Sequence, residues 1–137
     1  MNSNVLSKLH TLSSSEKEEL LSLLQELELS KARESCEDEF LSFVKQMWSA
    51  FIHGKHHEIM AEAFERVAKG ELKRLIINMP PRHTKSEFAS YLLPAWFLGK
   101  YPDKKIIQTA HTAELAVGFG RKVRNLVNSP DFREIFP

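Results

Sequence analysis

Apolar residues recur at helical spacing over the first seventy positions of the chain. The first run begins at Ser15-Glu16-Lys17-Glu18, where Ser15 and Glu18 have the spacing of a capping box, and continues through leucines at helical intervals. Phenylalanines and aliphatic residues between positions 40 and 51 form a second stripe, and Met60, Phe64 and Val67 form a third, which Gly70 is expected to end. Three helices are therefore predicted, over about residues 15–29, 36–52 and 57–69.

The pattern changes after Gly70. Leu75-Ile76-Ile77 is a short apolar run typical of a buried strand, and Pro80-Pro81 should end it because proline cannot donate to a ladder. A helical pattern begins near Lys85, and Pro94 is expected to kink or divide it. Residues 105–110 predict a second strand, Thr112 or His111 is expected to begin a further helix, and Ser129-Pro130 is expected to open a last short turn.

This order predicts a β-α-β-α arrangement after the N-terminal helices. Such alternation is typical of an α/β fold with a parallel sheet and right-handed crossovers. Two strands are too few to complete a parallel sheet, which is normally covered on both faces. The sequence therefore predicts a helical region at 1–50 followed by an incomplete α/β domain at 51–137.

Composition and charge narrow the class of protein. With 137 residues, 42% apolar and 27% charged, the chain is typical of about one globular domain rather than a disordered tail or a membrane protein. The single Cys36 excludes an internal disulfide and a thiolate zinc cluster. The N-terminus, residues 1–8, lacks the pattern of a secretory signal, so a cytoplasmic location is expected.

The charges are unevenly divided along the chain. Residues 1–47 contain nine acidic and five basic residues, a net charge of −4, whereas residues 48–137 contain nine acidic and fourteen basic residues, a net charge of +5. The second part is thus the better candidate for an anionic ligand. Arg121, Lys122 and Arg124 suit a surface that follows DNA phosphates, although such a cluster also occurs as a solvated helix face.

The segment Leu75 to Ser86 has the layout of a phosphate-binding loop: a strand, a tight loop, Lys85-Ser86 and a helix. Backbone N–H groups at a helix N-terminus attract an anion, a lysine adds charge for the outer phosphates, and a hydroxyl can ligate Mg²⁺. The glycines of the usual pattern are absent, because Met79 and Thr84 occupy their positions. A β-branched Thr84 should resist a positive φ. The alternative interpretation is an exposed Pro-Arg-His loop that caps a helix.

Residues 73–100 resemble the start of the ATPase domain in the large terminase subunit of tailed bacteriophages. That family often has Pro-Pro-Arg-His-Gly-Lys-Ser followed by Pro-Ala-Trp, and this chain has Pro80-Pro81-Arg82-His83-Thr84-Lys85-Ser86 and then Pro94-Ala95-Trp96. The similarity extends into residues 101–107 and 119–130, and covers about residues 51–137.

The resemblance implies an ATP site with Mg²⁺ as the metal. Lys85 would contact the β- and γ-phosphates, Ser86 would hold the metal, and Arg82 would assist hydrolysis, so Arg82 and Lys85 are the implied catalytic residues. The implied nucleotide-binding residues are Pro81, Arg82, His83, Thr84, Lys85 and Ser86 in the loop, with His53 and His56 upstream.

The upstream element is Phe51-Ile52-His53-Gly54-Lys55-His56, which matches the family's His-Gly-x-His sequence. In the family this element binds adenine, and a ring here would stack on the base. The alternative is that Phe51 belongs to the core and that His53, His56 and His57 lie in a polar loop. A metal site built from these three histidines is disfavoured, because no Cys or carboxylate has suitable spacing.

The function implied by the resemblance is an ATP-driven motor that packages viral DNA into a preformed capsid. Its implied partners are double-stranded DNA, the small terminase subunit and the portal protein, on which it would assemble as a homo-oligomeric ring in the host cytoplasm, without a membrane. The chain lacks an apolar strand ending in Asp-Asp or Asp-Glu, so by itself it is expected to hydrolyse ATP negligibly. Glu87 is interpreted as a partner of the helix dipole rather than the base.

The alternative function is a non-enzymatic helical module that binds a partner protein or DNA and carries a decayed phosphate loop. Thr84 and the missing acidic pair favour it. The leucines at 20–27 fit either function, since they can form core or a helix-pairing face, or dock a partner.

Overall fold

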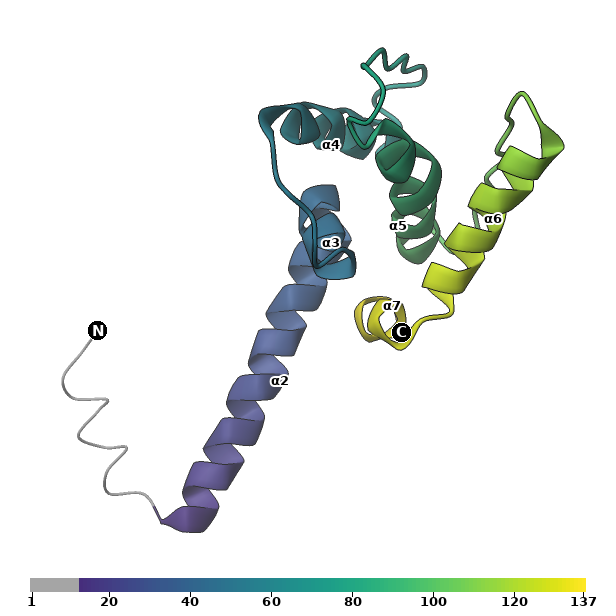
Figure 1. The fold of residues 1–137 in the computed structure, drawn as a ribbon. Coiled ribbons are helices and arrows are strands. Elements are labelled where there is room, and N and C mark those ends of the chain that lie inside the picture. The colour runs from purple at the N-terminus through teal and green to yellow at the C-terminus, as the bar shows by residue number, and fades with distance from the viewer. Residues whose placement is uncertain (1–12) are drawn as a thin grey trace. The chain divides into compact units, whose positions relative to one another are not determined.

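The computed structural model describes residues 13–137, and every regular element in that range is helical (Figure 1). The elements are α2 (Ser14–Asp38), α3 (Phe40–Met47), α4 (Lys55–Ala68), the π-helical turn η1 (Glu87–Leu92), α5 (Leu93–Lys100), α6 (Ala113–Val127) and α7 (Pro130–Ile135). The N-terminal segment on which the expected lack of a secretory signal depends lies outside the described residues. No helix within 13–137 is both long enough and apolar enough to cross a bilayer.

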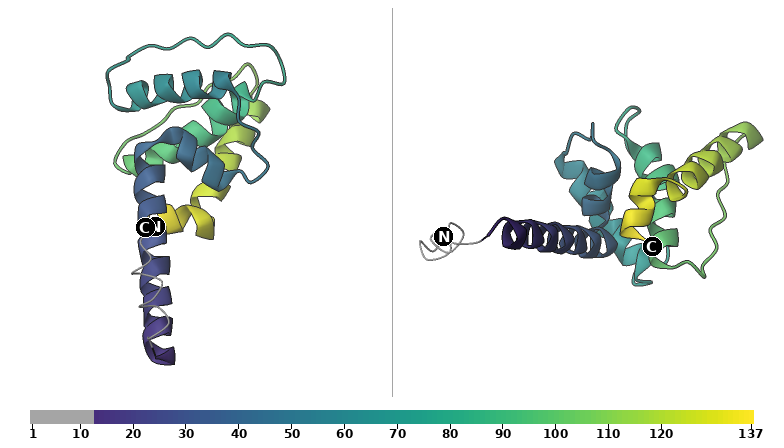
Figure 2. Two further views of the ribbon diagram at one scale, coloured as in Figure 1. Left: turned by 90° about the vertical axis from the view of Figure 1, so that its left-hand side faces the viewer. Right: turned by 90° about the horizontal axis from the view of Figure 1, so that it is seen from below.

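The predicted α/β fold with a parallel sheet is wrong for this structure, because residues 13–137 contain no strand. The segments 75–77 and 105–110 are irregular, and Figure 2 draws both as coil. A strand is stable only when a neighbouring strand pairs with its backbone, and neither segment has such a neighbour among the described residues. Ile76 and Ile107 are 85% and 89% exposed. A short apolar run does not by itself reveal whether a partner strand exists.

The first of two compact units ends at Ala32, and its described part, residues 13–32, is the N-terminal part of α2. The helix begins with a capping box, as predicted, but two residues earlier: Ser13 Oγ accepts from the Glu16 N–H, and the Ser13 N–H donates to Glu16 Oε2 at 2.8 Å. Hydrogen bonding of the carboxylate to the Ser13 backbone, and then to the Ser13 side chain, lowers the pKa of Glu16. Five leucines in the described part of this unit do not form core, because they are exposed: Leu21, Leu23, Leu24, Leu27 and Leu29.

The second unit, residues 33–137, contains all the remaining helices. The sequence predicts helices over 15–29 and 36–52, but in the structure the first continues to Asp38, Glu39 is extended with φ −114° and ψ 116°, and α3 ends at Met47. The Phe40 N–H donates to Glu65 Oε1 at 2.9 Å instead of continuing the helix. The freed carbonyls of Cys36 and Glu37 accept from the Trp96 indole and from Lys100 Nζ, respectively. Side chains from α4 and α5 thus satisfy the backbone groups at the break.

The helix α4 confirms the third predicted helix, and Gly70 follows it with φ 78°, a left-handed conformation typical of a residue beyond a helix end. The final helices also follow the sequence pattern: Thr112 caps α6 by accepting from the Leu115 N–H, and Ser129 caps α7 by accepting from the Phe132 N–H.

The helical stretch predicted near Lys85 is also confirmed, since residues 85–100 are helical throughout. Its irregular part is η1, which ends two residues before Pro94. Pro94 has no N–H to donate to the Ser90 carbonyl, and the Gln108 side-chain amide donates to that oxygen at 2.7 Å. One contact of the irregular segment 105–110 therefore compensates for the proline.

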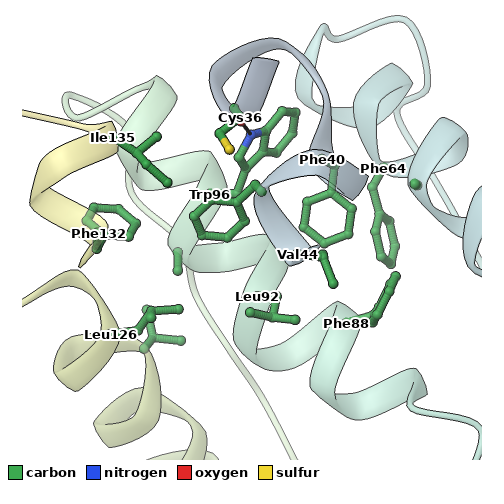
Figure 3. Close-up of a cluster of buried hydrophobic side chains, with 14 of the residues drawn as sticks. Cys36, Phe40, Val44, Phe64, Phe88, Leu92, Trp96, Leu126, Phe132 and Ile135 are labelled. Carbon is green, nitrogen blue, oxygen red and sulfur yellow. Dashed lines mark hydrogen bonds between the residues drawn. The ribbon is translucent and has the colours of Figure 1, made fainter. Parts of the chain in front are cut away.

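The core of the second unit is aromatic (Figure 3). Phe40 lies at its centre, with ring centroids 5.4 Å from Phe64, 5.6 Å from Phe88 and 5.5 Å from Trp96, all in edge-to-face geometry. Such pairs stabilise beyond the apolar area they bury, by about 0.5–1.5 kcal/mol each. The core fixes α3, α4, η1 and α5 to one another, and this frame carries the loop described next.

Candidate nucleotide site

The loop that precedes Lys85 has an alternating backbone conformation. Arg82 has φ 65° and Thr84 has φ 56°, whereas His83 between them has a negative φ. These are the only two non-glycine residues with positive φ among residues 13–137. Alternation of this kind turns successive N–H groups toward one side and forms a concave nest that binds anions.

The backbone donors of the loop are open. Within the described part of the chain, no hydrogen bond engages the N–H groups of residues 82–86. The first helical hydrogen bond runs from the Phe88 N–H to the Thr84 carbonyl at 2.9 Å. The open donors therefore lie at the N-terminus of the helical stretch 85–100, where the helix dipole favours negative charge. A hollow of about 580 Å³ is lined by residues 79–87.

The side chains of this hollow suit a phosphate. Arg82 and Ser86 are exposed and Lys85 is half-buried, so two cations and a hydroxyl lie at the open amides. His83 is also exposed, and its Nδ1–H donates to the Pro81 carbonyl at 2.9 Å. The structure thus places the predicted loop residues Pro81 to Ser86 around one hollow.

Thr84 has the left-handed conformation that a β-branched residue resists, and a relay of hydrogen bonds accompanies it. The Gly54 N–H donates to His57 Nδ1 at 3.0 Å, so a neutral His57 ring carries its proton on Nε2. Nε2–H then donates to Thr84 Oγ1 at 2.7 Å, and the Thr84 hydroxyl donates to the His83 carbonyl at 2.7 Å. Each donor in this relay has one acceptor, so the network is internally consistent.

His57 is 3% exposed and is the only buried polar or charged residue among 13–137. Its ring stacks on Phe88 at 4.8 Å and meets Phe51 edge-on at 4.7 Å. Burial, followed by the nearby His56 and His53, lowers the pKa of His57 below its usual 6.5. The ring is therefore held neutral, as the hydrogen bond from Gly54 requires.

The two histidines predicted to bind adenine, His53 and His56, have different surroundings. The His56 ring lies 3.8 Å from that of His57 and 5.9 Å from that of His83, so it stands beside the phosphate loop. His53 Nε2 lies 3.3 Å from Glu58 Oε1, and its ring lies 6.5 Å from that of His57. His56 and His57 belong to α4 and not to a polar loop, and Phe51 is half-buried against the core.

His57 was not predicted as a site residue, although a signal was present in the sequence. It precedes Met60 by three residues and Phe64 by seven, which places it on the buried face of α4. A histidine on the buried face of a helix needs hydrogen-bond partners, and His57 finds them in Gly54 and Thr84.

Other charged residues near the loop are engaged. Glu87 Oε1 accepts from Lys122 Nζ at 3.0 Å, and Lys122 also lies over the Tyr91 ring at 5.7 Å. Of the basic cluster considered for DNA, Lys122 contacts Glu87 although its side chain is 52% exposed, and Arg121 and Arg124 are exposed too.

The side chain predicted to hold a metal ion at this loop is that of Ser86, whose hydroxyl lines the hollow. Residues 13–137 contain no cluster of three or more His, Cys, Asp or Glu side chains able to hold a metal ion. The hollow offers one hydroxyl beside cations and amides. This donor set fits a Mg²⁺ ion that phosphates bring with them, because such an ion takes few of its ligands from the protein.

The chain matches no family model, no curated protein and no solved structure.

Proposed function

We propose that this chain binds ATP through the loop at residues 81–86, as part of a viral DNA-packaging motor of the large-terminase type. The observation that carries the ATP site is the alternating φ of Arg82 and Thr84, with open amides at a helix N-terminus beside Lys85. The packaging role is supported by the sequence resemblance over about residues 51–137. On that resemblance, double-stranded DNA, the small terminase subunit and the portal protein are its partners, with a ring assembled on the portal in the host cytoplasm.

In this proposal the amides of 82–86 and the Lys85 ammonium bind the phosphate oxygens. Ser86 gives one oxygen to Mg²⁺, which when bound neutralises charge on the β- and γ-phosphates. Arg82, exposed at the rim, adds charge that matters most as the phosphoryl group transfers. His56 offers a ring beside the loop for the adenine, whereas His53 is paired with Glu58.

The chain alone is proposed to hydrolyse ATP very slowly. The chain has no apolar strand ending in an acidic pair, and Glu87, the carboxylate nearest to the Lys85-Ser86 pair in sequence, has its Oε1 paired with Lys122 Nζ at 3.0 Å. Steady turnover by the purified chain that disappears in Lys85→Ala would contradict this part of the proposal.

Calorimetric titration with MgATP tests the site. The parent chain should bind, and Lys85→Ala should weaken binding at least about tenfold, because it removes a charge that contacts the phosphate oxygens; an unchanged melting temperature would show that the variant is folded. Lys45→Ala, an exposed lysine on α3, is the matched control and should bind like the parent. Absence of MgATP binding by the parent, or equal binding by Lys85→Ala, would overturn the proposal.

A second candidate function is a non-enzymatic helical module with a decayed phosphate loop. The exposed leucines of α2 favour it. Five leucines between positions 21 and 29 are exposed on this helix and could contact a partner protein. Thr84→Gly distinguishes the two, because it restores the family's common residue. A clear rise in MgATP affinity would indicate a decayed site, whereas unchanged affinity would indicate that Thr84 is a tolerated variant.

A further inference from the structure

The loop has a structural problem that its sequence creates. Threonine at φ 56° bears a steric strain that glycine avoids, and isolated left-handed conformations of this type persist only where the surroundings enforce them. Thr84 is half-buried, and the contact that reaches its side chain from outside the loop is the 2.7 Å hydrogen bond from His57 Nε2.

His57 is well fixed for such a role. It belongs to the first turn of α4, its Nδ1 accepts from the Gly54 N–H, and its ring lies between Phe51 and Phe88. Phe88 packs on Phe40 at the centre of the core, so the position of the imidazole is set by the core of the second unit. The hydrogen bond therefore connects a rigid part of the fold to a strained residue of the loop.

We infer that His57 is a positioning residue for nucleotide phosphate: by donating to Thr84 Oγ1 it holds Thr84 in the left-handed conformation, and so keeps the amides of 82–86 convergent. This inference rests on the proposed ATP site and adds a residue to it that contacts no nucleotide. It also explains how threonine can stand at the last position before Lys85. The hydrogen bond substitutes for the conformational freedom of glycine.

Two variants of His57 separate the hydrogen bond to Thr84 from the one to Gly54. In His57→Asn the side-chain oxygen occupies the place of Nδ1 and can still accept from Gly54, but nothing reaches Thr84. In His57→Gln the side-chain amide nitrogen occupies the place of Nε2 and can still donate to Thr84. Both variants lose the ring, so each controls for the lost packing on Phe51 and Phe88.

The experiment measures MgATP affinity of the full 137-residue chain by calorimetry, with melting temperatures recorded for every variant. His57→Asn should weaken binding about three- to tenfold, the worth of one net hydrogen bond, and His57→Gln should bind within about twofold of the parent. In a Thr84→Gly background, His57→Asn should cause no loss, because glycine adopts the loop conformation without help. Equal effects of His57→Asn and His57→Gln, or a loss that persists in the Thr84→Gly background, would overturn the inference.

Backbone amide NMR spectra of the ligand-free chain test the inference without nucleotide, and therefore independently of the proposed function. If the parent does not bind MgATP, the proposed function fails, and the amide signals of 82–86 decide the inference alone. They should move in His57→Asn and remain near their parental positions in His57→Gln. Unmoved signals in His57→Asn would show that Thr84 keeps its conformation without His57, and the inference would be wrong.

Discussion

The Trp96 indole caps the end of α2: its Nε1–H donates to the Cys36 carbonyl at 2.8 Å, in a buried position (Figure 3). In an unbroken helix that carbonyl would accept from the Phe40 N–H, which instead donates to Glu65. Trp96 therefore replaces a main-chain hydrogen bond that the break at Glu39 removes, and it does so from α5, sixty residues along the chain.

Trp96→Phe should lower the free energy of unfolding by about 1–3 kcal/mol, because it retains most of the ring but leaves a buried carbonyl without a donor. Trp48→Phe is the control, since Trp48 is only half-buried and should cost less. Urea denaturation, monitored by far-UV circular dichroism, compares the free energies of unfolding of the three proteins. Equal stability of Trp96→Phe and the parent would mean that water satisfies the Cys36 carbonyl.

The second prediction concerns Gln108 and Pro94. Because Pro94 cannot donate to the Ser90 carbonyl, Gln108→Leu should leave that oxygen without the 2.7 Å hydrogen bond and lower the free energy of unfolding by about 1 kcal/mol. In a Pro94→Ala background the alanine N–H can donate to the Ser90 carbonyl. Gln108→Leu should then lower the free energy of unfolding by clearly less. Equal costs in both backgrounds would show that Gln108 acts through packing.

The helices could be predicted from the sequence because hydrophobic period and capping residues act locally. Thr112, one of the two expected first residues, caps α6, and Met60 and Phe64 mark the buried face of α4. Ser129 caps the helix α7, where the sequence predicts a short turn. The break at Glu39 could not be predicted, since the groups that satisfy it come from Glu65, Trp96 and Lys100. The prediction of two strands was wrong for the same physical reason, because an apolar run becomes a strand only when another strand pairs with its backbone.

The candidate site, too, could be predicted from the sequence only in part. Lys85, Ser86 and the resistance of Thr84 to positive φ are properties of the local sequence. The residue that contacts Thr84 at φ 56° is His57, twenty-seven positions earlier, and no pattern in the sequence connects the two. The strained position could therefore be predicted, whereas the contact that accompanies it could not.

The third prediction is a dependence of stability on pH. The folded state lowers the pKa of His57, chiefly through burial and then through His56 and His53. The unfolded chain, with a histidine pKa of about 6.5, binds a proton first as the pH falls. The contribution of neutral His57 is thus complete above about pH 6.5 and is lost as the pH falls from there toward the lowered pKa of the folded protein.

Denaturation at about pH 7.5 and about pH 5.5, on either side of the ordinary histidine pKa, checks this dependence. The parent should lose more stability between the two values than His57→Gln, which keeps the donor to Thr84 and cannot titrate. His53 and His56 also face His57, with Glu58 beside His53 and His83 beyond His56. Both proteins contain these groups, so the difference between them isolates His57. An identical loss in the two proteins would contradict the prediction.

The last prediction concerns Thr84, where two effects oppose each other. Thr84→Gly removes the left-handed strain, about 1–2 kcal/mol. It also leaves the buried His57 Nε2–H without an acceptor, at about 1–3 kcal/mol, and gives the unfolded chain more freedom, at about 0.5–1 kcal/mol. The losses exceed the gain, so glycine should lower the free energy of unfolding by about 1 kcal/mol.

Thr84→Ser isolates the strain, because serine keeps the hydroxyl that accepts from His57 and removes only the β-branch. It should raise the free energy of unfolding by up to about 1 kcal/mol. The expected order of stability is therefore serine above threonine above glycine, measured by urea denaturation at about pH 7.5, where His57 is neutral. If glycine is the most stable of the three, strain outweighs the hydrogen bond, and His57 does not hold Thr84 in place.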